Sequence, residues 1–140
     1  MRKKKPHRRI YANRDFKSAD QWMALSSGDI VDIVAPGWAC KKSELELAIQ
    51  FIENLKLIPR VHSRLFAKNK FFSNSDNFRE QNLIEALSDK RSRAVWCVRG
   101  GYGSIRLLPA LNKIEKPDMT KLFIGYSDIT SLHNFLNYFW

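Results

Sequence analysis

The stretch AVWCVRGGYGS, residues 94–104, decides the fold class of this chain. Its first five residues form a short apolar run, which is typical of a strand buried inside a sheet. The glycines that follow allow a tight turn, and they let the backbone approach a ligand with exposed N–H groups. Open α/β sheets bind their ligands at such turns, where a strand ends and a helix begins.

Strand-like and helix-like segments alternate on both sides of this stretch. Residues 30–35 and 57–61 predict two earlier strands, and residues 122–124 predict a later one. The first helix has an apolar face of Leu45, Ala48, Ile49, Ile52 and Leu55, and Ser43 with Glu46 fits a capping box at its start. The alternation predicts an α/β fold: a Rossmann-like or flavodoxin-like open, mostly parallel sheet with helices on both faces.

Two more helices are predicted. Asp76 or Asn77 is positioned to cap one, whose apolar stripe is Phe78, Leu83, Ile84 and Leu87. The last helix follows the strand at residues 122–124 and presents Ile129, Leu132, Phe135, Leu136 and Phe139. The loop at residues 66–75 is rich in phenylalanine, which either covers a site or folds back on the core.

The net charge of +10 belongs mainly to one end of the chain. Seven basic residues and no acid precede Asp15, which leaves 17 of the 24 basic residues against all 14 acidic ones. We therefore expect a largely disordered basic leader at residues 1–27 and one domain at residues 28–140. Because no apolar run suits a signal peptide or a bilayer span, we expect a cytoplasmic protein without membrane or specific nucleic-acid partners.

Ser127 lies in a second turn between a strand and a helix, Gly125-Tyr126-Ser127-Asp128. A serine in such a turn resembles a nucleophile elbow, in which the hydroxyl projects from the sheet and the next N–H helps to stabilise an oxyanion. Ile129 occupies the place of the usual second glycine. The alternative is that Ser127 or Asp128 only caps the following helix.

The glycine turn has alternatives as well. Gly101 and Gly103 begin a dinucleotide fingerprint, but Arg106 stands at its third glycine position. A non-catalytic phosphate- or nucleotide-binding module, or a purely structural turn, is therefore open at this point. Cys97 is expected to be a buried thiol, and no cluster at ligand spacing predicts a metal site.

The two turns and their flanks together resemble the LD-carboxypeptidase family, which comprises muramoyltetrapeptide carboxypeptidases and related microcin-immunity peptidases. Residues 94–109 and 121–133 carry the two specific blocks, RGGYG and GYSD, in this order. Residues 28–37 are similar to the opening strand and turn of that family. Residues 76–79 are similar to the start of its second helix.

The resemblance implies that Ser127 is the nucleophile and that backbone N–H groups of Asp128, Gly100 and Gly101 form the oxyanion hole. It implies removal of the terminal D-alanine from a murein tetrapeptide through an acyl-enzyme, without a cofactor. It leaves open a homodimer of the full-length protein. The alternative inside the same family is a microcin-immunity-type peptidase that acts on peptide–nucleotide conjugates.

The family resembled takes its His and Glu from a second domain, which we do not find in these 140 residues. We expect His7, His62 and His133 to be structural or solvated. A serine without a base is a poor nucleophile, so we expect a truncated and inactive form. A remnant of an interrupted gene without any function is a further hypothesis.

Overall fold

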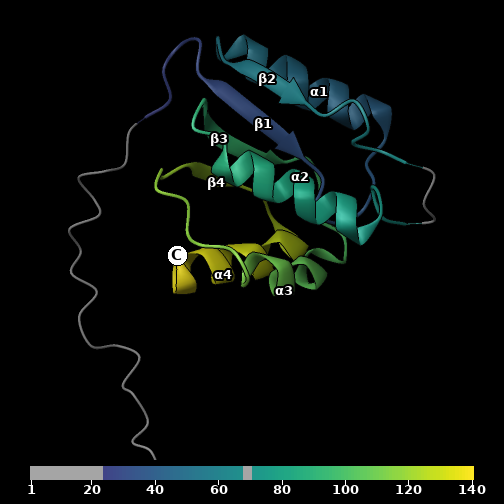
Figure 1. Cartoon of the computed structure of the whole chain (residues 1–140). Coiled ribbons are helices and arrows are strands. Elements are labelled where there is room, and N and C mark those ends of the chain that lie inside the picture. The colour runs from purple at the N-terminus through teal and green to yellow at the C-terminus, as the bar shows by residue number, and fades with distance from the viewer. Residues whose placement is uncertain (1–23, 68–70) are drawn as a thin grey trace, which may run out of the picture.

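The fold is built on a sheet of four parallel strands in the order β2-β1-β3-β4 (Figure 1). The computed structural model describes residues 24–67 and 71–140. Its strands are β1 (Ile30–Val34), β2 (Ile58–Val61), β3 (Ser92–Cys97) and β4 (Leu122–Ile124). The predicted α/β class with an open parallel sheet is confirmed.

Helices cover both faces of this sheet, as predicted. They are α1 (Lys42–Asn54), α2 (Asp76–Ser88), α3 (Leu108–Leu111) and α4 (Thr130–Phe139), with 3-10 turns at Ser104–Leu107 and Ser127–Ile129. Because side chains alternate along a strand, Ile33 and Ala94 pack with α1, whereas Val34 and Val95 pack with α2, α3 and α4. The sheet therefore separates two hydrophobic clusters.

The start of α1 corrects one prediction. The carboxylate that accepts a hydrogen bond at this helix start belongs to Glu44, which accepts from the backbone N–H of Lys41 over 2.7 Å. Glu46, expected in a capping box with Ser43, pairs with Lys42 one turn away instead. The predicted apolar face is right for Leu45, Ala48, Ile49 and Ile52, but Leu55 lies at the end of the helix with 53% of its surface exposed.

The start of α2 corrects another. Ser75 is the N-cap, and its hydroxyl accepts from the N–H of Phe78, because the carboxylate of Asp76 is engaged by Arg79 and Arg106. Leu83 and Leu87 of the predicted stripe are buried, and Ile84 packs against them. The ring of Phe78 is only half-buried and lies edge-on to His62.

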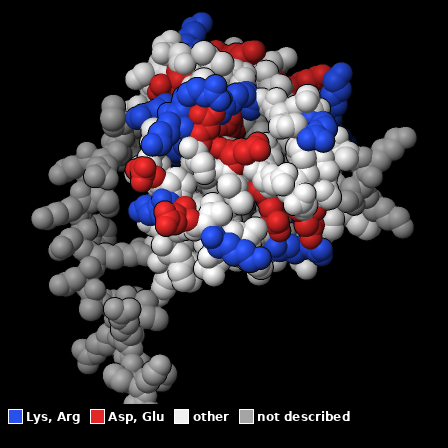
Figure 2. All heavy atoms as spheres, viewed as in Figure 1, with Lys and Arg blue, Asp and Glu red and all other residues white. Residues whose placement is uncertain are grey.

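The face of the sheet under α2, toward the amino ends of β3 and β4, carries a network of charged side chains. Arg60 on β2 donates to Asp32 on β1 over 2.5 and 2.8 Å, and its Nη2 lies 2.8 Å from Asp89. Arg91 also pairs with Asp89, and Lys121 donates to the carbonyls of Ala86 and Asp89 and to Ser92 Oγ. Figure 2 shows acidic and basic side chains interleaved over the face that α2 covers.

Residues 1–23 of the expected leader lie outside the described residues. Leu25, near its end, packs against the cluster under α1. In the described ranges no helix is long and apolar enough to cross a membrane. Cys97 is a buried thiol, as predicted, and burial raises its pKa.

Candidate active site

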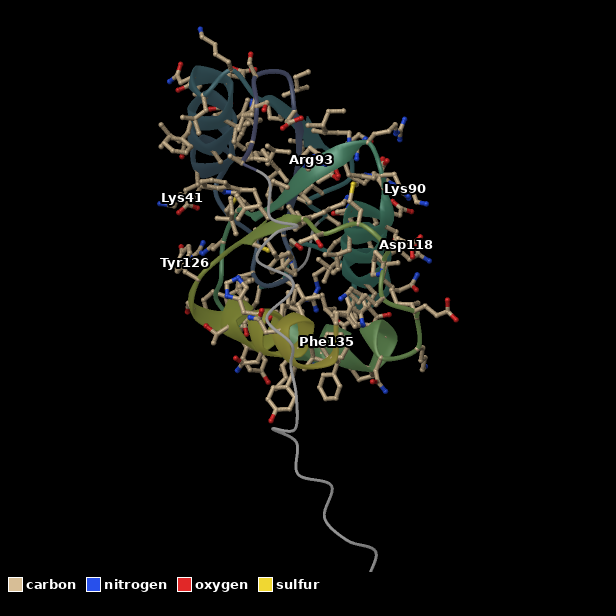
Figure 3. All side chains as sticks on the ribbon, turned by 90° about the vertical axis from the view of Figure 1, so that its left-hand side faces the viewer. Lys41, Lys90, Arg93, Asp118, Tyr126 and Phe135 are labelled. Carbon is tan, nitrogen blue, oxygen red and sulfur yellow. The ribbon has the colours of Figure 1, made fainter. Side chains whose placement is uncertain are left out.

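The turns that follow β1, β3 and β4 meet at the carboxyl edge of the sheet. Lys41 and Tyr126, which follow β1 and β4, lie on one side of the molecule, whereas Lys90 and Asp118 lie on the opposite side, where β3 and β4 begin (Figure 3). A methyl group on Gly37 would lie 2.4 Å from the carbonyl oxygen of Gly100 and 3.0 Å from Asp128 Oδ2. The three turns are therefore in contact.

Ser127 has the backbone of a strained turn. Its φ of 59° is in the left-handed region, and Lys56 is the one other non-glycine residue of the described ranges with positive φ. L-residues avoid this region because Cβ approaches the following carbonyl, so such residues often mark functional sites. The residue follows β4 and begins a 3-10 turn that leads into α4, and it is exposed. This is the geometry of a nucleophile elbow.

Close packing explains why Gly125 precedes this turn. A methyl group on Gly125 would lie 2.4 Å from Cγ2 and 2.9 Å from Cβ of Ile129, far inside van der Waals contact. Ile129 is fully buried in the cluster under α4. The isoleucine that replaces the usual second glycine of an elbow is therefore accommodated by the first glycine.

Gly100 brings the glycine turn against the elbow. A methyl group here would lie 2.8 Å from the carbonyl oxygen of Tyr126, 3.0 Å from Ser127 Cβ and 3.3 Å from Asp128 N. The carbonyl of Gly100 accepts from the N–H of Trp38 over 3.1 Å, which fixes the turn to the loop after β1. The predicted residues Gly100, Ser127 and Asp128 are thus brought together.

Gly101, the remaining predicted residue, lies against an aromatic side chain. Its φ is 93°, and a methyl group on it would lie 2.6 Å from Cγ of Trp38. Gly103, with φ of 112°, is equally close to the ring of Phe72. These contacts account for the glycines at 101 and 103 without a bound phosphate.

Ser104 ties the glycine turn to the elbow by hydrogen bonds. Its N–H donates to Asp128 Oδ2 over 2.8 Å, and its hydroxyl donates to the backbone carbonyl of Asp128 over 2.6 Å. The same hydroxyl lies 2.7 Å from Ser131 Oγ, which donates to that carbonyl over 3.0 Å. Ser104 is completely buried. Sequence reasoning did not single out this contact.

Arg79 on α2 binds both the turn after β1 and the glycine turn after β3. Its buried guanidinium donates to the carbonyls of Pro36 and Gly103 and pairs with Asp76, and it stacks on the ring of Phe72. Burial raises the pKa of Asp76, but hydrogen bonds from Arg106 and Arg79 outweigh burial and leave this pKa below its ordinary value. Phe72, in the phenylalanine-rich loop, therefore packs against Arg79 and Gly103 beside the candidate site.

Similarity to known proteins covers most of the chain. The sequence profile of the LD-carboxypeptidase N-terminal domain matches residues 31–139. The chain belongs to the LD-carboxypeptidase family.

Three relatives illustrate how far the similarity extends. A putative carboxypeptidase of Rickettsia conorii is 43% identical over 112 residues, which are 79% of this chain and 35% of the relative. A probable murein peptide carboxypeptidase of Bacillus subtilis is 33% identical over 110 residues, 79% of this chain and 34% of the relative. The crystal structure of an MccF-like protein from Bacillus anthracis has a TM-score of 0.69 at 28% identity, covering 80% of this chain and 35% of that one. The chain spans about a third of the length of the curated relatives it matches.

Aromatic side chains surround the three turns of this LD-carboxypeptidase domain. Trp38, Phe71, Tyr102 and Tyr126 are exposed, and the rings of Trp38 and Phe71 are 6.2 Å apart. Arg99, two residues after β3, donates to the carbonyl of Ala39 over 3.1 Å and lies 3.8 Å from Glu44. Aromatic rings beside a basic group offer apolar walls and a binding partner for an anionic group.

The two imidazoles in the described part of this LD-carboxypeptidase domain have structural neighbours. His62 accepts from the N–H of Arg64 and packs on Phe78, and His133 lies edge-on to Phe123 with its Nε2 buried. Residues 24–67 and 71–140 hold no group of three or more His, Cys, Asp or Glu side chains suited to a metal ion. Burial beside Glu44 raises the pKa of Cys40 to about 11, so this thiol is not a ready nucleophile.

A half-open cavity of about 570 Å³ between β2 and α2 contains none of the predicted site residues. It is lined by Asp32, Arg60, His62, Glu85 and Asp89, among others. Arg60 already pairs with both Asp32 and Asp89. Three charged side chains that line this cavity are therefore paired with one another.

Proposed function

We propose that this domain is the nucleophile-bearing part of a serine-type LD-carboxypeptidase that releases the terminal D-alanine of a murein tetrapeptide. The observation that carries the proposal is the left-handed backbone of Ser127, at the carboxyl end of β4 and against Gly100. Membership of a carboxypeptidase family and the similarity to a probable murein peptide carboxypeptidase of Bacillus subtilis support the substrate class.

In the proposed reaction, Ser127 Oγ attacks the carbonyl carbon of the last peptide bond and loses its proton to a general base. The N–H groups of Asp128 and of Gly100 and Gly101 donate to the oxyanion that forms. The tetrahedral intermediate collapses when the C–N bond breaks, and the base passes the proton to the amine of the leaving D-alanine. Water then attacks the acyl-enzyme, which releases the shortened peptide and restores Ser127.

We propose that the general base lies in the part of the full-length relatives that this chain does not match. By the resemblance it is a His oriented by a Glu, both from a second domain. His62 and His133 have the structural contacts described above, which favours their exclusion from this role. We therefore propose that the 140-residue chain alone releases D-alanine very slowly or not at all.

The test joins this chain to the C-terminal two thirds of the Rickettsia conorii relative, its matched third being replaced. We expect the fusion to release D-alanine from murein tetrapeptide, and Ser127→Ala to reduce kcat by about a thousandfold or more. Ser43→Ala, an exposed serine on α1, is the matched control and should leave the rate unchanged. An active Ser127→Ala fusion would show that Ser127 is not the nucleophile.

A second candidate function is the hydrolysis of a peptide–nucleotide conjugate, as in microcin immunity. The similarity to the MccF-like structure, at 28% identity, favours keeping it. The same fusion, offered an aminoacyl sulfamoyl adenosine and the tetrapeptide in parallel, separates the two substrates. Hydrolysis of the sulfamoyl compound without D-alanine release would favour this second function.

A further inference from the structure

We propose that Ser104 is a positioning residue, which acts through Asp128 to hold the Ser127 elbow against the glycine turn. The inference rests on the proposed function for its catalytic meaning, but its structural content stands on the contacts of this chain. We call the three residues Ser104, Asp128 and Ser131, with the hydrogen bonds between them, the serine–aspartate latch.

The latch is a built polar cluster. Two groups of Asp128, its carboxylate and its backbone carbonyl, are both held by Ser104, over 2.8 and 2.6 Å. Ser131 adds a second donor to the same carbonyl. Since Ser104 is fully buried, loss of its hydroxyl would leave polar atoms short of a partner where water does not compensate.

The latch acts next to the strained residue. A left-handed backbone at a non-glycine residue persists when the surrounding structure over-determines it. Asp128 directly follows Ser127, so fixing its carbonyl and carboxylate also limits the rotation of the peptide unit that carries its N–H. That N–H is one proposed oxyanion donor. Gly100, whose N–H is another proposed donor, lies four residues before Ser104.

The same contacts give the Asp128 carboxylate a structural role. Oδ2 accepts from a backbone N–H and faces Gly37, where even a methyl group would come within 3.0 Å. A carboxylate in this position serves as a hydrogen-bond acceptor for the turn. Asparagine offers an equivalent oxygen, whereas alanine does not.

The first experiment uses NMR on the complete 140-residue chain and needs no activity. In Asp128→Ala we expect amide exchange of Ser104 to rise by about tenfold or more, as for the loss of one buried hydrogen bond. We also expect loss of the strong intraresidue HN–Hα NOE that a positive φ produces at Ser127. Asp128→Asn should restore both signals, and Ser43→Ala should change neither.

The second experiment measures kinetics of the fusion. Ser104→Ala and Asp128→Ala should lower kcat by about 10- to 100-fold with little change in KM, because donors to the oxyanion act in the transition state. Asp128→Asn should recover most of kcat. A role limited to folding would lower the melting temperature without this split between kcat and KM.

Each outcome decides the inference separately from the function. Unchanged exchange at Ser104 in Asp128→Ala overturns the latch, and a retained NOE at Ser127 overturns its positioning role, whether or not the fusion is active. Should Asp128→Ala fail to fold, Ser104→Ala removes only the hydroxyl bond to the Asp128 carbonyl and keeps the N–H at position 104, and the NOE at Ser127 is then the deciding readout. An inactive wild-type fusion that still shows the NMR changes counts against the proposed function and leaves the latch supported.

Discussion

The two edges of the sheet are stabilised in different ways. Toward the amino edge, on the face under α2, ion pairs predominate: Arg60 bridges Asp32 and Asp89, and Arg91 also pairs with Asp89. Lys121 adds hydrogen bonds to the carbonyls at the end of α2. At the carboxyl edge, ion pairs are fewer among the described residues and side chains hold the backbone: the guanidinium of Arg79 and the hydroxyl of Ser104 donate to main-chain carbonyls of turns that contact each other through glycines. The difference indicates that main-chain position is fixed where ligands bind in this class of fold.

Removing the buried clamp of the carboxyl edge should have the largest effect on stability. Arg79→Met removes the donor to the buried carbonyl of Pro36 and one of the two donors to the carbonyl of Gly103, which keeps the N–H of Arg106. We expect it to lower the free energy of unfolding by about 3 kcal/mol in urea titrations. Arg106→Met is the matched control, since its half-exposed side chain shares Asp76, and it should cost less than about 1 kcal/mol. Equal losses from both would contradict the distinction between clamp and surface pair.

Crowding the elbow should have the next largest effect. Gly125→Ala places a methyl group against Ile129, and we expect a loss of about 2 kcal/mol in the same titration. Since Ile129 is the obstacle, Gly125→Ala combined with Ile129→Gly should cost less than the sum of the single changes, by about 1 kcal/mol. Strict additivity would mean that the alanine is accommodated elsewhere.

The amino edge should tolerate the loss of a single donor better. Lys121→Met removes hydrogen bonds to Ala86, Asp89 and Ser92, but the ammonium is partly open to water, which can replace it. We expect a loss of about 1 kcal/mol, against none for the exposed Lys113→Met. A loss as large as that from Arg79→Met would remove the contrast between the edges.

Acid should destabilise both edges of the sheet, and the loss of stability per carboxylate should be the smallest of these effects. Burial raises the pKa of Asp76 but hydrogen bonds from Arg106 and Arg79 lower it further, and hydrogen bonds from Arg91 lower the pKa of Asp89. A carboxyl whose folded pKa lies below its ordinary value of 3.8 stabilises the fold above that pH, and this contribution is lost as pH falls through the folded pKa.

The melting temperature should therefore decline from about pH 4 downward. Asp76→Asn, which carries no titrating carboxyl, should flatten this decline, while Asp29→Asn, in the turn before β1, serves as the control. The same slope in Asp76→Asn and in the unchanged chain would show that Asp76 does not carry the effect.

The fold was largely predictable because its signals are local. The four strands lie within one or two residues of their predicted positions, and the apolar faces of the helices follow from helical periodicity. The errors fall at the ends of helices. Leu55 and Phe139, predicted on apolar faces, are exposed at the carboxyl ends of α1 and α4. At helix starts, Glu44 and Ser75 make the bonds expected of Glu46 and of Asp76 or Asn77. Competing partners decide there: Glu46 pairs with Lys42, and Asp76 with two arginines.

The sequence alone determined the order of strands and helices, the placement of glycines at tight turns and the candidate elbow at Ser127. The elements and the glycines follow from periodicity and from the φ that each residue type tolerates. The elbow follows from the place of Ser127 between a strand and a helix and from the family resemblance. Only the tertiary structure decided that Ser104 binds Asp128, 24 residues later, and that Arg79 binds the carbonyl of Pro36, 43 residues earlier. Such contacts depend on how the sheet brings separate turns to one edge. A local sequence pattern does not show which distant residues will meet there.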